Sequence, residues 1–279
     1  MRRRAGRLAA VAAAALMTGG CGASDDAFVR TFFNGEVILD TFPRLLAEGV
    51  RNTLLIAFLS IVLGVVIGLF FAVLLLSARW WVRLPARVYV DVFRGLPVVL
   101  TVMLIGVGLP AAGFRPFGNG AFGYAVLAIG IISGAYSAEI FRSGIQSVDP
   151  GQMQAARSLG MSYLTAMRLV VVPQGIRRVL PAMAGQFVKD VKESSLVYVL
   201  GLSVGERELF FIAHEEVART YNSSPFIAAG LCYLSITIPL TYGVNWLDRR
   251  LRDGRAAPVT APPDEDGSPA APITTGGTR

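Results

Sequence analysis

The sequence NTLLIAFLSIVLGVVIGLFFAVLLLS occupies residues 52–77 and contains no charged side chain. At 1.5 Å per residue, a helix of this length extends about 39 Å, enough to cross a bilayer with some tilt. Backbone groups in lipid must be satisfied within the protein, so helix-length apolar segments predict an all-α polytopic membrane protein. We expect five transmembrane helices, at about residues 52–77, 88–109, 124–141, 181–204 and 226–246.

The composition indicates the same class. Of the 279 residues, 53% are hydrophobic and only 16% are charged, which is too apolar for an ordinary soluble domain. The net charge of +7 does not predict a nucleic-acid partner, because the arginines stand at the ends of the apolar segments, as topology signals do. The positive-inside rule then places the amino terminus outside and the carboxyl terminus inside. The cytoplasmic loops are marked by Arg79, Arg83, Arg87, Arg157, Arg168, Arg177 and Arg178.

Residues 1–21 have the layout of a signal-like leader, with four arginines before an apolar stretch from Leu8 to Met17. The leader ends in small residues and Cys21, which resembles a bacterial lipoprotein cleavage box and makes Cys21 a candidate for lipidation. An uncleaved leader and a later start at Met17 are the alternatives.

Three further regions follow the leader. Residues 22–50 are expected outside the cell or at the membrane interface, with one apolar side of a surface helix formed by Phe32, Phe33, Val37, Ile38, Phe42, Leu45 and Leu46. Residues 51–252 form the transmembrane domain. Residues 253–279 are rich in Pro, Ala, Gly and Thr and are expected to be a disordered cytoplasmic tail.

The stretch DPGQMQAARSLGMSYLTAMRLVVVP, residues 149–173, predicts a helix-turn-helix between the third and fourth spans. Asp149 is placed to cap the first helix, and Gln152 completes a capping box with it. Gly160 is expected in the left-handed conformation that closes a helix. The second helix is expected to end before Pro173, because proline disfavours helix at the preceding residue. Neighbouring Ala155 and Ala156 would allow close approach to a partner groove.

Charged residues in the predicted fourth span form a second candidate site. Lys189 and Glu193 are four residues apart and can pair on a helix. A lone charge in the bilayer centre costs at least about 2.5–3.5 kcal/mol, so these groups should face the bundle interior or water. Two interpretations stay open, a structural ion-pair network or a polar substrate pathway. The candidate pathway residues are Lys189, Lys192, Glu193, Ser194 and Ser195.

Other polar residues have simpler expected roles. Asp91 and Arg94 are expected to snorkel at the interface, and Pro97 after Gly95 predicts a kink that could serve as a hinge. Glu139 and Arg142 should form a local salt bridge. No catalytic or metal site is expected, because the two cysteines and one histidine form no ligand set. Cys232 is expected in the core and His214 in a solvated position.

Five segments resemble the permease subunits of bacterial ABC importers for polar amino acids. They are RNTLLIAFLSIVLGVVIG (51–68), YVDVFRGLPVV (89–99), GAYSAEIFRSGIQSVDPGQMQAARSLGMS (134–162), VVPQGIRRVLPA (171–182) and VKESSLVYVLGL (191–202). The family's EAA loop runs Glu-Ala-Ala, three residues, Gly, nine residues, an aliphatic, one residue and Leu-Pro. The corresponding positions here are Gln154, Ala155, Ala156, Gly160, Val170, Val172 and Pro173. Gln154 replaces the family's Glu, and Glu193 stands where many relatives have Asp.

The resemblance implies a type I ABC importer permease in the bacterial inner membrane, whose EAA loop couples to an ATPase. Implied partners are a cytoplasmic ABC ATPase, a second identical or related permease, an extracytoplasmic amino-acid-binding protein and membrane lipid. ATP and Mg would be used by the ATPase, since this sequence has no Gly-Lys-Ser/Thr phosphate loop. The chain itself is expected to bind no cofactor and to be no enzyme. The alternative is a secondary transporter or channel that uses the charged turn of the fourth span as an ion relay.

Overall fold

A computed structural model describes residues 24–253, and the predicted leader, Cys21 and the tail from residue 254 lie outside the described residues. Every regular element in the described part is helical. Most are α-helices; η1, η2 and η3 are π-helical and η4 is a 3₁₀ helix. The elements are α2 (Ser24–Phe32), α3 (Gly35–Arg44), η1 (Leu45–Val50), α4 (Arg51–Leu75), α5 (Trp80–Gly95), α6 (Val98–Met103), η2 (Leu104–Gly108), α7 (Leu109–Ala111), α8 (Ala121–Gln146), α9 (Pro150–Ser158), α10 (Tyr163–Ala166), η3 (Met167–Val171), α11 (Val172–Glu193), η4 (Ser194–Leu200), α12 (Leu209–Thr220) and α13 (Ser224–Asp253).

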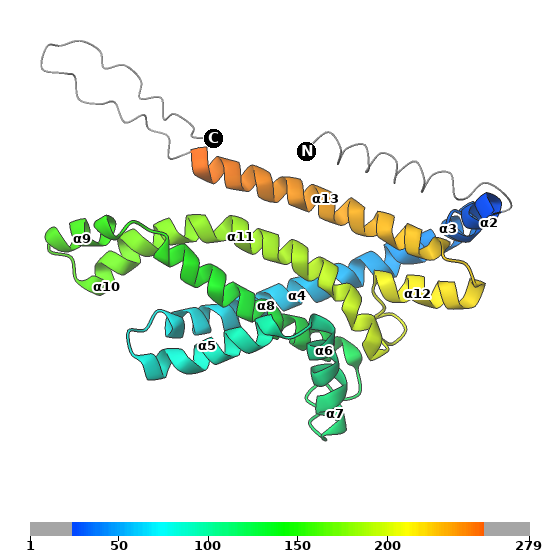
Figure 1. Cartoon of the computed structure of the whole chain (residues 1–279), viewed down its shortest axis with the longest axis horizontal. Coiled ribbons are helices and arrows are strands. Elements are labelled where there is room, and N and C mark those ends of the chain that lie inside the picture. Colours follow the sequence, from blue (N-terminus) through cyan, green and yellow to red (C-terminus); the bar gives the residue numbers. More distant parts are fainter. Residues whose placement is uncertain (1–23, 254–279) are drawn as a thin grey trace, which may run out of the picture.

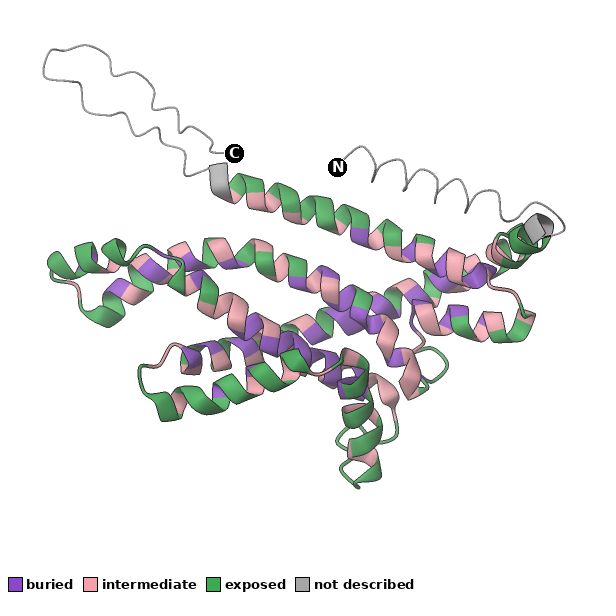
Figure 2. Cartoon of the chain, in the orientation of Figure 1, coloured by how far each residue is buried: buried purple, intermediate pink, exposed green. Residues whose placement is uncertain are grey.

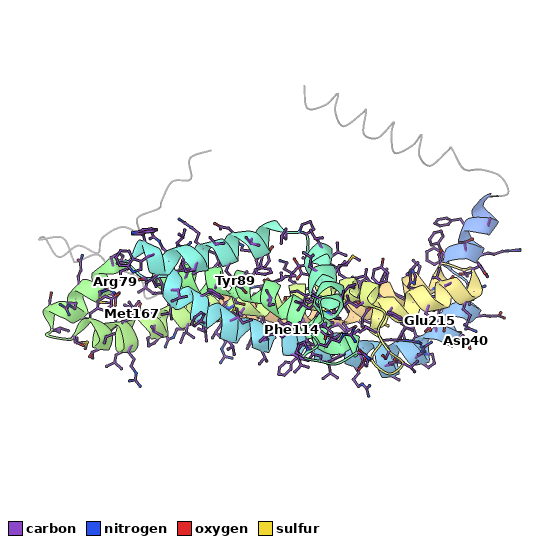
Figure 3. All side chains as sticks on the ribbon, turned by 90° about the horizontal axis from the view of Figure 1, so that it is seen from below. Asp40, Arg79, Tyr89, Phe114, Met167 and Glu215 are labelled. Carbon is purple, nitrogen blue, oxygen red and sulfur yellow. The ribbon has the colours of Figure 1, made fainter. Side chains whose placement is uncertain are left out.

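The long helices α4, α8, α11 and α13 run along the length of an elongated bundle (Figure 1). The α9–α10 hairpin lies at one end, which we call the loop end, and α2, α3 and α12 lie at the other, which we call the α12 end. Figure 3 shows Arg79 and Met167 toward the loop end and Asp40 and Glu215 at the α12 end. The short helices α6 and α7 project from the side of the bundle (Figure 1).

Close packing of α4 on α8 forms the centre of the bundle. A Cβ atom added at Gly64 would lie 2.8 Å from Ser133 Oγ, and one at Gly68 would lie 2.5 Å from Ser137 Cβ. Small residues spaced four apart let helix backbones approach closely, which is how transmembrane helices associate in lipid. Figure 2 shows the buried positions concentrated where α4, α8 and α11 adjoin.

Three helices are long and apolar enough to cross a membrane, at Ala27–Leu75, Ala121–Gln146 and Ser224–Leu251. They correspond to the first, third and fifth predicted spans. In place of the second, α5 is followed by a helical stretch at Val98–Ala111 with a bend of 109° between them, which gives a fourth span if the pair is counted as one. The fourth predicted span falls on α11 and η4, which are not among the helices long and apolar enough to cross a membrane. The five-span arrangement therefore stays a prediction.

The bend after α5 follows from its sequence. Leu96 is extended, with φ −79° and ψ 142°, because the ring of Pro97 disfavours the helical conformation in the residue before it. Pro97 then begins α6 as its cap residue. The predicted kink at Gly95 and Pro97 is confirmed, and it is a complete break between two helices rather than a bend within one.

The amino-terminal apolar face differs from the prediction for residues 22–50. Ile38, Phe42 and Leu45 pack against α12 and α13 in a buried cluster that includes Leu209 and Ile212, instead of all facing the membrane surface. Leu45 is fully buried there. The expectation of one continuous lipid-facing side was therefore wrong for these residues, because α12 supplies a protein surface that covers them. Phe33 and Leu46 remain more than half exposed, at 53% and 51%.

Candidate functional site

The α9–α10 hairpin is built by local backbone chemistry. The Asp149 carboxylate accepts from the Gly151 N–H at 2.7 Å and caps α9. At the other end of α9, Gly160 has φ +84°, and its N–H donates to the Arg157 carbonyl at 3.0 Å. The Met161 N–H donates to the Ala156 carbonyl at 3.2 Å, which completes a Schellman closure. The predicted cap and left-handed glycine are confirmed.

Two details of the predicted hairpin were wrong. The Gln152 side chain does not complete a capping box; its Oε1 accepts from Gln174 Nε2 at 3.2 Å and so ties α9 to the first turn of α11. The second helix does not end before Pro173, because α10, η3 and α11 are continuous from Tyr163 to Glu193. The π-helical turn η3 ends at Val171, two residues before the proline, and such a turn adjusts the backbone hydrogen bonds where proline lacks an N–H.

Most of the expected coupling residues are accessible, as the largely exposed hairpin in Figure 2 shows. Gln154, Ala155, Gly160 and Pro173 are exposed, Val170 is half-buried and Ala156 is buried. Sequence reasoning missed the leucines around the turn. Leu159 is 81% exposed and Leu164 is 77% exposed, so the tip of the hairpin presents an apolar surface.

The charged turn of α11 contains the predicted pair. Lys189 Nζ lies 3.4 Å from Glu193 Oε1, and it also lies 3.2 Å from the centre of the Tyr136 ring on α8. Glu193 Oε2 is buried and has no hydrogen-bond partner among the described residues. Lys189 therefore lies at the contact between α8 and α11, with one Glu193 oxygen paired to it and the other oxygen buried.

The remaining candidates of the fourth span do not join this pair. Lys192 is exposed. The Ser194 and Ser195 hydroxyls donate to carbonyls one turn earlier in the chain, on Val191 at 2.8 Å and on Lys192 at 2.7 Å. Both serines thus satisfy their own hydroxyls locally, as serine does in helices.

Asp190 is the polar residue that sequence reasoning did not select. Its side chain is fully buried and accepts from Ser133 Oγ at 2.7 Å and from Gln186 Nε2 at 2.8 Å. Buried carboxylates need such partners because an unsatisfied polar group is costly away from water. Asp190 therefore joins α11 to the same glycine-contacting serine that lies in the α4–α8 interface.

A polar cleft of about 180 Å³ lies between α5 and α8. Asp91 and Arg94 line it and are both exposed, so their expected snorkelling at the interface stays a prediction. The predicted ion pair between Glu139 and Arg142 is confirmed, with Arg142 Nε donating to Glu139 Oε2 at 3.1 Å. Gly95 ends α5 just beyond this cleft, at the break described above.

The α12 end carries a separate polar network. Arg44 Nη2 lies 2.8 Å from Glu215 Oε2, and Arg207 Nη1 lies 2.7 Å from the same oxygen. Glu208 caps α12 by accepting from the Phe211 N–H at 2.7 Å, and Tyr233 donates to it at 3.1 Å. Burial raises the pKa of Glu208 from 4.5 to about 7.

The residues considered for metal binding or redox chemistry have ordinary positions. Cys232 is buried and His214 is exposed, as predicted. Within residues 24–253 no group of three or more His, Cys, Asp or Glu side chains is arranged to hold a metal ion.

Residues 64–253 match the family of binding-protein-dependent transport system inner membrane components. The chain belongs to this family. This permease is 36% identical over 211 residues to the octopine transport system permease protein OccM of Rhizobium meliloti, with 73% of this chain and 84% of the relative covered. It is 34% identical over 221 residues to the glutamine transport system permease protein GlnP of Escherichia coli strain K12, with 79% and 98% covered.

A solved structure supports the same assignment. The crystal structure of an amino acid ABC transporter with histidines is 37% identical to this permease, with a TM-score of 0.69. The similarity covers 76% of this chain and 96% of that chain. The sequence resemblance to amino-acid ABC permeases is therefore confirmed, and the chain is an inner-membrane permease of that type.

Proposed function

We propose that this chain is the transmembrane permease subunit of an ATP-driven importer for polar amino acids, and that its α9–α10 hairpin couples to a cytoplasmic ABC ATPase. The observation that carries the coupling role is the hairpin itself. A Schellman turn at Gly160 holds Leu159 and Leu164 exposed at one end of the bundle, where a helix-in-groove contact could form. The similarity to glutamine and octopine permeases supports a polar amino acid as substrate.

The proposed assembly has two permeases, because one chain offers one hairpin and two-fold pairing engages two ATPases. The permease spans the inner membrane five times, with α11 and η4 as the fourth span, the α12 end outside and the loop end in the cytoplasm. A binding protein delivers the substrate at the α12 end. ATP and Mg are used by the ATPase. A secondary transporter driven through Lys189 and Glu193 is not favoured, because the similar proteins are ABC permeases.

The substitution Gly160→Val tests the coupling role. Gly160 has φ +84°, and nothing lies within 4 Å of a Cβ built there, so the substitution strains the turn without a steric clash. A residue with a Cβ costs about 1–2 kcal/mol in this conformation, whereas asparagine tolerates it. In proteoliposomes with the ATPase and binding protein, we expect Gly160→Val to abolish amino-acid uptake and the stimulation of ATP hydrolysis by binding protein.

The matched control is Gly160→Asn, which should keep both activities. Membrane insertion of both variants should equal that of the wild type, as measured by the yield in the membrane fraction. Normal uptake by Gly160→Val would contradict the coupling proposal. The variant Leu164→Cys provides a complementary test. We expect a crosslink from this cysteine to the ATPase. A crosslink only to extracellular partners would show that the loop end lies outside the cell.

A further inference from the structure

An apolar groove of about 420 Å³ lies between α4, α8 and α11. Every side chain that lines it is hydrophobic, and the lining includes Leu69 and Val73 of α4, Phe141 of α8, and Ile176 and Leu180 of α11. The four aliphatic residues in this list are 45–69% exposed. The groove therefore opens on the outside of the bundle, and it is not a void inside the core.

The groove belongs to the membrane-embedded surface of the protein. Its α4 wall is part of the segment Ala27–Leu75, which is long and apolar enough to cross a bilayer, and residues 52–77 carry no charge. The α4 residues that line the groove fall within positions 65–76, in the half of the helix that leads to Arg79 at the loop end (Figure 3). The groove thus lies in the membrane leaflet at the loop end, where lipid or another membrane segment fills it.

The size of the groove fits one flexible chain. At the roughly 30 Å³ that a water-sized group occupies in a liquid, the groove holds about 14 such groups, which is comparable to a fatty-acyl chain. A helix with its side chains is about 10–12 Å across and could insert only a few side chains. An acyl chain in the groove gains dispersion contacts with three helices, but the hydrophobic effect adds little because lipid tails are already apolar. The headgroup therefore decides which lipid binds.

Two arginines lie beside the loop end of the groove. Arg177 directly follows the lining residue Ile176. Arg79 comes three residues after the lining residue Leu76, so their Cα atoms are at most about 11 Å apart. Both arginines are exposed, as expected for side chains that meet a headgroup at the boundary between lipid and water.

The charge of these arginines is not balanced by nearby carboxylates. Within residues 24–253 neither Arg79 nor Arg177 forms an ion pair. The sequence contains no acidic residue at positions 49–90 or 150–189, which include all of α4 and most of α11. On α8, Glu139 is paired with Arg142. The loop end of the groove is therefore complementary in charge to an anionic headgroup.

We propose that this groove binds one anionic phospholipid, with an acyl chain between α4 and α11 and the headgroup phosphate at Arg79 and Arg177. A basic side chain near the membrane surface strengthens the binding of an anionic lipid by about fivefold. The proposal goes beyond the proposed function, because it requires only that the chain spans the membrane and depends on neither the substrate nor the ATPase.

Native mass spectrometry of the detergent-purified full chain, titrated with phosphatidylglycerol or with phosphatidylethanolamine, tests the headgroup. We expect one phosphatidylglycerol per chain to bind at least about fivefold more tightly than phosphatidylethanolamine. Arg177→Gln should lower the affinity for phosphatidylglycerol about fivefold and leave that for phosphatidylethanolamine unchanged. Arg249→Gln is the matched control, because Arg249 is an exposed arginine of α13 that does not line the groove, and it should change neither affinity.

Filling the groove tests the acyl-chain site. Leu69→Trp places an indole ring in the groove and should remove the tightly bound phosphatidylglycerol. Leu55→Trp is the matched control, because Leu55 is a leucine of α4 with a similar exposure, 43% against 49%, that does not line the groove. Val73→Phe, at a 69% exposed position of the lining, is a second and smaller filling variant with the same expected result. All three variants should keep the wild-type Tm.

A phosphatidylglycerol with a photoreactive group in its acyl chain locates the site. We expect labelled peptides from residues 65–76 and 172–183 in the wild type, and no such label in Leu69→Trp. Equal affinity for the two lipids would overturn the proposal. So would labels confined to other segments, or phosphatidylglycerol binding by Leu69→Trp and Val73→Phe that equals that of Leu55→Trp. Loss of permease dimers in Leu69→Trp, with its lipid retained, would identify the groove as an interface between copies and would also overturn it.

Discussion

Substitution of Gly68 by alanine should separate α4 from α8. The added Cβ would lie 2.5 Å from Ser137 Cβ and 3.0 Å from the Ala138 backbone nitrogen. Carbon atoms prefer a separation of about 3.5–4.0 Å, so the helices must move apart by about 1 Å. Because backbone atoms cannot rotate out of the way, the strain has no local remedy, and overpacking of this kind costs about 1–3 kcal/mol of unfolding free energy.

Gly243→Ala provides the matched control, because Gly243 is in helix α13 and nothing lies within 4 Å of its added Cβ. Alanine is favoured over glycine in a helix by up to about 1 kcal/mol, so the control should be neutral or stabilising. Thermal unfolding of the detergent-purified protein, followed by tryptophan fluorescence, measures both. Each kcal/mol should shift Tm by about 2–4 °C for a chain of this size.

A compensating variant sharpens the test. Ser137→Gly removes the nearest contact atom, so Gly68→Ala combined with Ser137→Gly should recover part of the lost stability, with a coupling of at least about 0.5 kcal/mol. If Gly68→Ala were as stable as Gly243→Ala, or if the double variant recovered nothing, the close α4–α8 packing would not be the source of stability.

Three further substitutions address other parts of the protein. Burial raises the pKa of Glu208 to about 7, so the unfolding free energy should be highest below pH 4.5 and fall by at most about 3 kcal/mol as the pH rises to 7. Glu208→Gln should flatten this pH dependence in chemical denaturation; an unchanged slope would assign it to other groups. Ser133→Ala removes a donor to buried Asp190 and should cost about 1–3 kcal/mol, whereas Ser143→Ala, which removes only a local bond to Ile140, should be nearly neutral in the same assay. Leu164→Asp, at a 77% exposed position, should change stability by less than about 0.5 kcal/mol but reduce co-purification of the ATPase; full retention of the ATPase would exclude Leu164 from the contact.

Features set by neighbouring residues were predictable from the sequence. The Asp149 cap, the left-handed Gly160, and the pairs Lys189–Glu193 and Glu139–Arg142 depend on spacings of four residues or fewer, and the structure has each of them. The apolar segments also gave three of the spans directly, because length and hydropathy determine whether a helix can cross a bilayer.

Features that depend on how helices are rotated about one another were not predictable. Asp190 meets Ser133 across 57 positions of sequence, and no local pattern distinguishes it from its charged neighbours. The same is true of the arginines of α5. Their spacing fits an interfacial helix as well as it fits a helix that lines a cleft, and only the position of α8 distinguishes the two. The prediction that the helix ends before Pro173 was wrong for another reason. The rule that proline ends a helix applies to regular α-helices, and it does not allow for a π-helical turn such as η3 just before the proline.

The uninterrupted helix from Tyr163 to Glu193 gives the hairpin and the charged turn a common backbone. At 1.5 Å per residue, Leu164 and Lys189 are about 38 Å apart along it, with no loop between them to absorb a displacement. In the proposed coupling, a displacement at the tip is transmitted along this helix, through η3 and past Pro173 and Pro181, to Lys189, which lies against the Tyr136 ring. The proposed ATPase contact and the candidate pathway residue Lys189 therefore share one secondary-structure element, so movement at one is linked to movement at the other.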